Sequence, residues 1–449
     1  MEQSVEIHSL SPADVRRLIR HEDARISTTT GLASGFQQAN VTMLPASLAE
    51  DFEVFCQRNK APLPLIYRSR PGETDCPPVA KDADIRTDIS QYCVYENGKV
   101  SKTVSNLKDY TSPLKDMVCF YLGCSFGFEG KLKEAGVPVR NVEQQKNISM
   151  YKTSVPCVPT GVFHCPLVVT MRPVPAEMLD TVVEVTHLNP LAHGAPVHIG
   201  DPALFGIQDV SRPDYGDAVD QQPGDVPVFW ACGVTSLEAV LTAKPALAFS
   251  HSPGCMFLTD LPDSSSALDL SRHSLDLSRH SLDPRLTPLS FKLSHKPLLY
   301  SLASKRAVHK IRQVETIIDE KKRPGAVMEK DALVRCCLAL SHASSVAIVT
   351  HGLNRLSPGA VAMANTLSSL GKRVTMVMDP NHDIVQGSVS SGERNMTRFI
   401  IIKLKKGFCF RVFKVRAQFA SHKMLIGRVS QGKQVLGDGS DKDRFRSPL

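Results

Sequence analysis

Residues 118–136 read VCFYLGCSFGFEGKLKEAG, and this stretch decides the fold class. Its apolar start predicts a buried strand, because a short apolar run that ends at a glycine is typical of one. Residues 123–125 predict a sharp turn, and the mixed apolar and charged residues after it predict a helix that ends near Gly136. A strand that runs through a tight turn into a helix is a typical unit of a mixed α/β fold.

The same order of elements occurs on both sides of this stretch. Towards the N-terminus, a short strand at 39–44 precedes a helix at 46–58 with apolar residues at helical spacing. Towards the C-terminus, CPLVVTMRPV predicts a strand with Arg172 at its end, and a helix follows over 175–188. The sequence therefore predicts a mixed α/β (α+β) fold with a substantial sheet.

Length and charge limit the classes of partner. The chain has 449 residues, which is too long for one compact core and predicts two or three domains. It contains no apolar run long enough for a membrane span. Its net charge of +8 comes from the C-terminal end, because residues 385–449 hold 14 Lys and Arg against 4 acidic residues. A basic tail without a pattern of aromatic stacking residues does not indicate a nucleic-acid groove, so we expect neither membrane nor nucleic acid as a partner.

The cysteines and the N-terminal residues bear on the cellular compartment. The twelve cysteines are scattered and form no CxxC pair, so we predict free thiols, no disulfides and no metal site. Residues 1–30 carry acidic as well as basic side chains, whereas a mitochondrial presequence is poor in acids. Within them, SPADVRRLIRHED predicts a helix that Ser11 caps, with Pro12 in its first turn. These features alone favour the cytosol.

The composition changes after the first domain. LDLSRHS occurs twice in succession, at 268–274 and 275–281, which indicates a low-complexity linker over 263–295. Residues 296–383 contain two predicted helices and then a strand, a helix and a strand, the opening of a Rossmann-like parallel sheet. The further strands that such a sheet needs do not follow, so we predict a truncated second domain. A basic divergent tail completes the chain over 384–449, where FIIIKLKKGFCFRVF could form a hairpin.

Residues 193–232 hold the densest group of chemically functional residues. They include HGAPVHIGDP, PDYGDAV and GDVPVFWACGVT, which combine two histidines, clustered aspartates and the only tryptophan with repeated Gly and Pro. Gly and Pro mark loops, where binding and catalytic side chains are commonly placed. For any single residue an ordinary turn is the alternative, but the group as a whole favours a site.

Several sequence blocks, in one order, resemble a known family. GLASGFQQANVTMLPASLAEDFEVFCQRN, FYLGCSFGFE, VPCVPTGVFHCPLVVTMRPV, HGAPVHIGDPALFGI, GDVPVFWACGVT and HSPGCMFLTDL are similar to blocks of the D-glutamate cyclase and hydro-lyase family. The resemblance covers residues 10–262 and implies a catalytic domain of two subdomains there. SKRAVHKIRQVETI and SHASSVAIVT resemble the start of the second α/β domain of the vertebrate mitochondrial members, from which this chain departs near Asp383.

The resemblance implies an activity and a compartment. It implies a hydro-lyase that converts D-glutamate to 5-oxo-D-proline and water, with a small-molecule substrate and no cofactor. It also implies the mitochondrial matrix, with the cytosol as the alternative. Two other functions stay open, a catalytically silent module that binds small carboxylates and an inactive truncated isoform. Whether the chains associate into a homo-oligomer is also open.

The implied reaction needs a site that holds a carboxylate, deprotonates an ammonium group and protonates a poor leaving group. Arg172, at a strand end, and Arg86, in DIRTD, could each bind a carboxylate through two N–H groups. An ion pair with Asp84 or Asp88 is the alternative for Arg86. We rank Arg172 higher, because strand ends commonly open into the site of an α/β sheet.

Loop residues are the candidates for proton transfer and substrate contact. His198 is the first candidate proton shuttle, because an imidazole titrates near neutral pH, and Asp201 could orient it across the turn in VHIGDP. His193 and Asp217 are further candidates, which we assign to substrate binding. A hydrogen-bonded turn residue is the alternative reading for each of the four.

The turn in GCSFGFE could bind an anion, because backbone N–H groups at the start of a helix point outwards from it. Cys124 or Ser125 could also act as a nucleophile, although the sequence has no GxSxG elbow. The alternative is that Ser125 caps the helix and Cys124 is buried. Phe229 and Trp230 are expected to fill the core.

Overall fold

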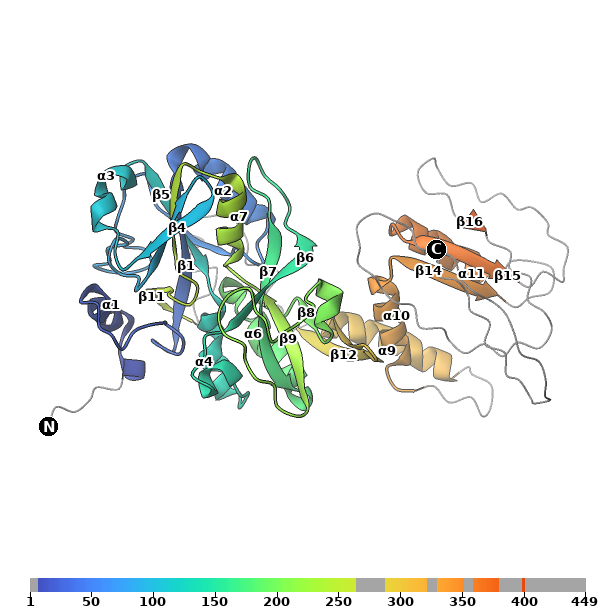
Figure 1. Cartoon of the computed structure of the whole chain (residues 1–449). Coiled ribbons are helices and arrows are strands. Elements are labelled where there is room, and N and C mark those ends of the chain that lie inside the picture. The colour runs from blue at the N-terminus through green and yellow to red at the C-terminus, as the bar shows by residue number, and fades with distance from the viewer. Residues whose placement is uncertain (1–6, 264–286, 321–328, 351–357, 379–397, 400–449) are drawn as a thin grey trace, which may run out of the picture. The chain divides into compact units, whose positions relative to one another are not determined.

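The computed structural model describes residues 7–263, 287–320, 329–350, 358–378 and 398–399. Helices and strands occur in mixed order along these ranges, which confirms the predicted mixed α/β class (Figure 1). The LDLSRHS repeat and most of the basic tail, including the predicted hairpin beyond Phe399, lie outside the described residues.

The first sheet is built around β1, whose middle residues are all buried. β1 pairs with β5 and with β10, in both cases antiparallel. The order across the sheet is β2-β5-β1-β10-β3-β4, and β11 also pairs with β1. The strands are β1 (Phe36–Pro45), β2 (Leu65–Arg68), β3 (Tyr92–Glu96), β4 (Lys99–Val104), β5 (Met117–Gly123), β10 (Leu247–His251) and β11 (Phe257–Pro262).

The second sheet consists of four antiparallel strands in the order β6-β7-β9-β8. They are β6 (Ser149–Pro156), β7 (Pro166–Pro175), β8 (His198–Ile199) and β9 (Asp225–Ala231). Separate apolar clusters cover the two faces of β7, so the residues in the middle of this strand are buried on both sides.

Helices connect the strands of both sheets, and their positions agree well with the sequence patterns. The predicted helix at 46–58 is α2, and the predicted strand, turn and helix of 118–136 are β5, η3 and α4. Ser11 caps α1, because its side chain accepts a hydrogen bond from the backbone N–H of Asp14. The α-helices are α1 (Pro12–Arg20), α2 (Ala46–Arg58), α3 (Thr111–Leu114), α4 (Glu129–Glu134), α5 (Arg140–Glu143), α6 (Leu179–His187) and α7 (Thr235–Ala243). The 3-10 helices are η1 (Ile7–Ser9), η2 (Lys108–Tyr110), η3 (Ser125–Phe128), η4 (Ala176–Met178), η5 (Pro190–Ala192) and η6 (Pro202–Phe205).

The two sheets contain equivalent strand pairs. β1 carries the motif VTMLP and β7 carries VTMRP. In the first pair, Leu44 of β1 lies opposite Val118 of β5, and in the second, Arg172 of β7 lies opposite Val228 of β9. Leu44 and Arg172 therefore hold the same position in two copies of one arrangement.

The helices that follow these strand pairs cross to the opposite sheet. α4 follows β5 of the first sheet, but Leu132 of α4 and Phe128 at the end of η3 belong to an apolar cluster with residues of the second sheet and of α6. α7 follows β9 of the second sheet, but Leu237 belongs to a cluster with residues of α2 and the first sheet. Figure 1 shows α4 close to α6, and α7 close to α2. Each helix thus contributes to the core of the other half, and α7 also packs on β7 of its own sheet.

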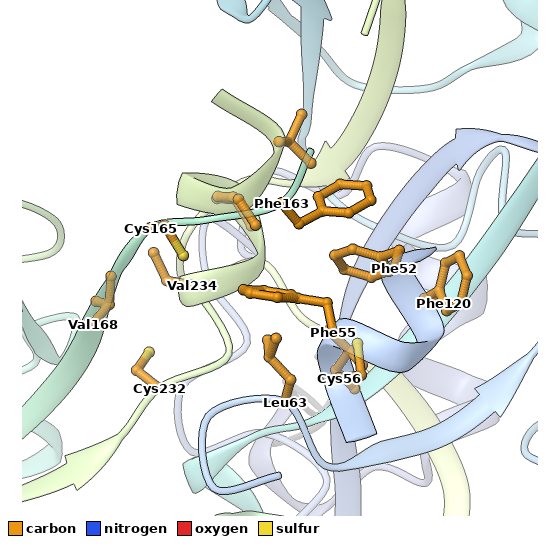
Figure 2. Packing of buried hydrophobic residues seen from close by; sticks show 14 of the residues in the cluster. Phe52, Phe55, Cys56, Leu63, Phe120, Phe163, Cys165, Val168, Cys232 and Val234 are labelled. Atoms are coloured by element: carbon orange, nitrogen blue, oxygen red, sulfur yellow. The ribbon is translucent and has the colours of Figure 1, made fainter. Parts of the chain in front are cut away.

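Aromatic side chains fill the core beside α2, as Figure 2 shows. Phe52 lies with its ring centroid 4.8 Å from that of Phe120 and 5.1 Å from that of Phe163, edge to face in both cases. Such geometry is favourable because the positive edge of one ring meets the negative face of the other. These contacts anchor α2 to β5 and to the loop between β6 and β7.

The residues after 286 begin with a strand pair. β12 (Pro288–His295) and β13 (Leu298–Ser304) are antiparallel. The prediction of a linker over 263–295 is therefore wrong for its last eight residues, which form β12. Their sequence, PLSFKLSH, alternates apolar and polar residues, and this alternation suits a strand.

The predicted strand, helix and strand follow. β14 (Ser345–Thr350) and β15 (Arg373–Met378) are parallel, with α11 (Pro358–Ser369) between them in sequence, so this unit is confirmed. β16 (Arg398–Phe399) adds a short parallel strand beside β15, where no further strand of the sheet was expected. The two predicted helices are α9 (Lys305–Glu320) and α10 (Ala332–His342). Among the described residues, no helix is long and apolar enough to cross a membrane.

Candidate active site

Arg172 is a buried cation between two aromatic rings. Its residue surface is 2% exposed, although it lies well inside β7 and not at an open strand end. The guanidinium carbon is 4.8 Å from the ring centroid of Phe128 and 5.7 Å from that of Trp230. Aromatic faces attract cations and exclude water, so this environment strengthens the interaction of Arg172 with any nearby anion.

The hydrogen bonds of Arg172 are incomplete. Its Nη2 donates to the carboxylate of Glu129 at 2.5 Å and to the hydroxyl of Ser125 at 3.2 Å. Within the described residues, Nε and Nη1 of Arg172 and the second carboxylate oxygen of Glu129 are buried without a hydrogen-bond partner. An unpaired buried polar group costs about 1–3 kcal/mol. The arrangement therefore suits an additional polar ligand.

The turn after β5 places Ser125 and Glu129 against Arg172. β5 ends at Gly123, where a Cβ atom would collide with the backbone oxygen of Leu191, so only glycine fits there. η3 then begins at Ser125 and α4 at Glu129. Residues four apart on a helical path lie on one side, and this explains why both side chains reach the same guanidinium.

Cys124 lies in this turn but is a poor nucleophile. It is buried, and burial raises the pKa of its thiol far above the ordinary value. A protonated thiol reacts slowly, since the thiolate is the nucleophile. The predicted alternative of a buried Cys124 is confirmed, whereas Ser125 makes no side-chain cap for η3 and bonds to Arg172 instead.

His193 is the second loop residue in this environment. It follows η5 with a left-handed backbone φ of +74°, and its Nδ1 donates to the backbone oxygen of Ala61 at 2.8 Å. Burial, and to a smaller degree the charge of Arg172, lowers the pKa of His193 to about 4. The imidazole is therefore neutral at physiological pH, with its proton on Nδ1.

His198 lies on the opposite face of the second sheet. It pairs with Phe229 of β9, while Arg172 pairs with Val228. Successive residues of a strand point to opposite faces, and directly paired residues share a face. The structure therefore does not bring His198 and Arg172 together.

The proposed pairing between His198 and the Asp201 side chain is also not formed. Nε2 of His198 donates to the backbone oxygen of Asp201 at 2.8 Å, and the imidazole stacks on Phe205. The carboxylate of Asp201 instead accepts the backbone N–H of Ala203 at the start of η6. Both residues have the ordinary turn role that was the alternative prediction.

Asp217 and Arg86 make local structural contacts and do not contact Arg172. The carboxylate of Asp217 accepts the backbone N–H of Asn147 at 2.8 Å. Arg86 forms a two-point ion pair with Asp84, with a shortest distance of 2.7 Å. This ion pair is the alternative that the sequence offered for Arg86.

Three buried polar residues near β7 were not among the predicted site residues. Glu129 contacts Arg172 directly, as described above. Thr170 lies on the same face of β7 as Arg172, and Asn141 belongs to α5, which packs against β7. The hydroxyl of Thr170 and both amide atoms of Asn141 lack hydrogen-bond partners in the described part of the chain. The change from Leu44 to Arg172 within the repeated VTMxP motif could have pointed to this face.

The side chains around Arg172 could bind a carboxylate group. In the described ranges, no three His, Cys, Asp or Glu side chains are grouped as ligands of a metal ion would be. Arg172, Glu129, Ser125 and His193 together offer a cation, a carboxylate, a hydroxyl and a neutral imidazole.

Comparison with known proteins agrees with these features. The model of the family described as D-glutamate cyclase matches residues 118–260, which include most of β5, all of η3 and α4, and Arg172. A Bacillus licheniformis protein with the provisional name of hydro-lyase is 46% identical over 257 residues, which are 57% of this chain and 97% of the relative. A similarly named protein of Geobacillus kaustophilus is 45% identical over 254 residues, 57% of this chain and 95% of the relative.

The human mitochondrial D-glutamate cyclase extends the similarity beyond the first domain. It is 38% identical over 407 residues, which are 87% of this chain and 64% of that protein. Little more than half of this chain covers the bacterial relatives almost completely, and the matched family model includes Arg172. The chain therefore belongs to the D-glutamate cyclase family.

Proposed function

We propose that this chain is a hydro-lyase that closes D-glutamate to 5-oxo-D-proline with release of water. Membership of the D-glutamate cyclase family supports this reaction, and so does the chemistry around Arg172. The observation that carries the proposal is a buried guanidinium with two unpaired N–H groups, next to a carboxylate and a hydroxyl.

Arg172 is proposed to hold the α-carboxylate of the substrate. D-glutamate has two carboxylates and one ammonium group, and a guanidinium can bind a carboxylate through two parallel hydrogen bonds. Phe128 and Trp230 keep water from the guanidinium, which strengthens this ion pair. A fixed α-carboxylate leaves the γ-carboxyl group free to fold back towards the amine.

Ser125 is proposed to assist at the reacting carboxyl group. Its hydroxyl oxygen accepts a hydrogen bond from Arg172, so its own hydrogen is free to donate. Attack of the amine on the γ-carboxyl carbon places negative charge on oxygen, and a donor aimed at that oxygen stabilises it.

The test is turnover by the full-length chain. Purified protein is incubated with D-glutamate or L-glutamate, and 5-oxoproline is separated by chiral chromatography. We expect product from the D isomer and a loss of at least 100-fold in kcat/KM in Arg172→Met. Arg68→Met is the matched control, because Arg68 pairs with Glu50 and Glu53 away from this site. Saturable binding of D-glutamate without product would instead identify a carboxylate-binding module.

We also propose that the protein acts in the mitochondrial matrix. The name of the human relative places that protein in mitochondria. Protease protection of the native protein in isolated mitochondria, before and after rupture of the outer and inner membranes, tests this location. Recovery of the protein only in the cytosolic fraction would contradict it.

A further inference from the structure

Glu129 occupies the part of Arg172 that a substrate carboxylate needs. Its Oε1 accepts a hydrogen bond from Nη2 at 2.5 Å, while Nε and Nη1 have no partner among the described residues. A guanidinium offers two edges for a two-point carboxylate bond, and Nη2 belongs to both of them. Nη2 has two hydrogens, which it donates to Glu129 and to Ser125. A carboxylate that binds Arg172 through two hydrogen bonds must therefore displace one of these acceptors, and we expect it to displace Glu129, because the two anions compete for the same cation.

We propose that Glu129 is the catalytic base, and that the α-carboxylate of the substrate activates it by taking its place on Arg172. This inference rests on the proposed function. The α-carboxylate and the ammonium group of an amino acid are attached to the same carbon. A carboxylate displaced from the guanidinium is consequently left beside the ammonium group from which a proton must be removed.

Displacement also leaves Glu129 without a cation beside it. Its side chain is 5% exposed, so little water is present to replace the lost cation. A buried carboxylate without a cationic partner favours its protonated form. Binding of the correct substrate therefore creates the base, whereas Glu129 stays neutralised by Arg172 in the free protein.

The neighbouring groups are less suited to this role. His193 is a weak base, because its pKa is lowered to about 4 by burial and by the nearby Arg172. Cys124 keeps its proton, since burial raises the pKa of the thiol. Ser125 has an ordinary hydroxyl, which can donate a hydrogen bond but does not accept a proton from an ammonium group. Glu129 is the one group in this set that combines negative charge with a free oxygen.

The protons balance in two transfers through Glu129. The carboxylate first removes one proton from the ammonium group, and the neutral amine forms the C–N bond with the γ-carboxyl carbon. Glu129 returns that proton to a carboxyl oxygen and then carries the second N–H proton to the same oxygen. The C–O bond breaks, and the oxygen leaves as water with both protons. Glu129 ends the cycle ionised and free to pair with Arg172 again.

The first test uses glutarate, which has both carboxylates of the substrate but no amine. Full-length wild type and Glu129→Gln are compared by isothermal titration calorimetry. Glutamine keeps the size of the side chain but does not compete as an anion, so we expect glutarate to bind Glu129→Gln at least tenfold more tightly. A purely structural role for Glu129 predicts weaker glutarate binding in this variant, because loss of the contact with Glu129 would leave Arg172 misplaced. Weaker or unchanged glutarate binding would overturn the exchange of carboxylates.

The second test measures turnover of D-glutamate by the same proteins. Loss of general base catalysis commonly costs about 10²–10⁴ in rate, so we expect kcat of Glu129→Gln to fall at least 100-fold while KM does not rise. Glu238→Gln is the matched control, because Glu238 is also buried and paired, with Lys152 and Tyr215. It should change neither glutarate affinity nor kcat beyond about twofold.

These outcomes separate the inference from the proposed function. Absence of turnover in the wild type would refute the proposed reaction and the base role together, while the glutarate titration would still decide carboxylate exchange. Normal turnover in Glu129→Gln would refute the base role alone. If Glu129→Gln does not fold, Glu129→Asp is tested in its place. Aspartate keeps the negative charge, so the variant should fold, but its shorter side chain places the carboxylate farther from the substrate and should lower kcat at least tenfold. An unchanged kcat would overturn the proposal.

Discussion

Leu44 and Arg172 hold the same position in two copies of one strand pair, and both side chains are buried. In the first copy the position is part of an apolar cluster with Phe52, Phe120 and Leu122. In the second copy the same position carries a cation that pairs with Glu129. A charge placed where the equivalent position needs none indicates that Arg172 serves function more than stability.

Replacement of Arg172 by leucine should make the second copy resemble the first. Arg172→Leu alone leaves Glu129 buried without its cation, so we expect a loss of about 3–5 kcal/mol in the free energy of unfolding. The double variant Arg172→Leu, Glu129→Leu removes both charges and should recover most of this loss, since apolar replacement of a buried ion pair is often neutral or stabilising. Urea denaturation followed by far-ultraviolet circular dichroism measures both. A double variant less stable than Arg172→Leu would contradict the argument.

His198→Ala should leave turnover of D-glutamate within about threefold of wild type. The imidazole lies on the face of the second sheet opposite Arg172 and hydrogen-bonds to a backbone oxygen. Its removal deletes the stacking on Phe205, which should lower the free energy of unfolding by about 1 kcal/mol. Steady-state kinetics and urea denaturation of the same preparation give both values. A loss of kcat above 100-fold in a stable variant would show that His198 takes part in catalysis.

The stability of the domain should decrease in mild acid because of two buried histidines. Burial lowers the pKa of His193 and of His251 to about 4, against about 6.5 for an unfolded histidine. Between these pH values the unfolded chain binds more protons than the folded chain, so the free energy of unfolding is lost as the pH falls from about 6.5 towards 4. The full shift is worth about 3 kcal/mol for each histidine.

Urea denaturation at pH 7.5 and pH 5.0, followed by the fluorescence of Trp230, measures this dependence. Trp230 is fully buried and is the only tryptophan of the chain, so its signal reports on the first domain. His251→Gln should reduce the difference between the two pH values, and His251 lies outside the Arg172 site in contact with the backbone of Val41. An undiminished difference in that variant would assign the acid sensitivity to other groups.

Brief alkylation of the native protein should label Cys336 and Cys337 before the other described cysteines. These two thiols are exposed, whereas the nine described cysteines of the first domain are buried. Burial also raises the pKa of Cys76 and of Cys232 to about 12, and this leaves little reactive thiolate. Iodoacetamide treatment followed by peptide mass spectrometry, with a urea-unfolded sample as the control, identifies the labelled positions. Early labelling of Cys232 would show that the core near the site opens readily.

Local sequence patterns were sufficient to predict the helices and strands, but not which face of a strand carries a given side chain. The helix at 46–58 and the strand, turn and helix at 118–136 follow from the spacing of apolar residues, which reports local structure directly. β7 is different, because its middle residues are buried on both faces and their pattern does not alternate. The sequence consequently predicts a strand there without showing which side Arg172 occupies.

The candidate site was predicted only in part, because the sequence does not show which faces of the strands and helices meet. Arg172, Ser125, Cys124 and His193 gather although up to 69 positions separate them, because β5, β7 and η5 meet in the fold. His198 lies close to His193 in sequence, but it belongs to a two-residue strand whose face depends on pairing with β9. Glu129 was missed because a glutamate after a helix start is common on surfaces, and its burial depends on the second sheet.

The crossed helices α4 and α7 have a consequence for the ancestry of this domain. Each strand pair buries part of its following helix against the other half, because Leu132 of α4 belongs to a cluster of the second half and Leu237 of α7 to a cluster that joins α2 and the first sheet to β7. A one-copy ancestor would therefore bury these helices more completely as a pair of chains that exchanged them. Gene duplication and fusion would join such a pair into one chain, after which the two copies could diverge. Only then could one copy keep leucine in its core while the other accepted arginine and became a site.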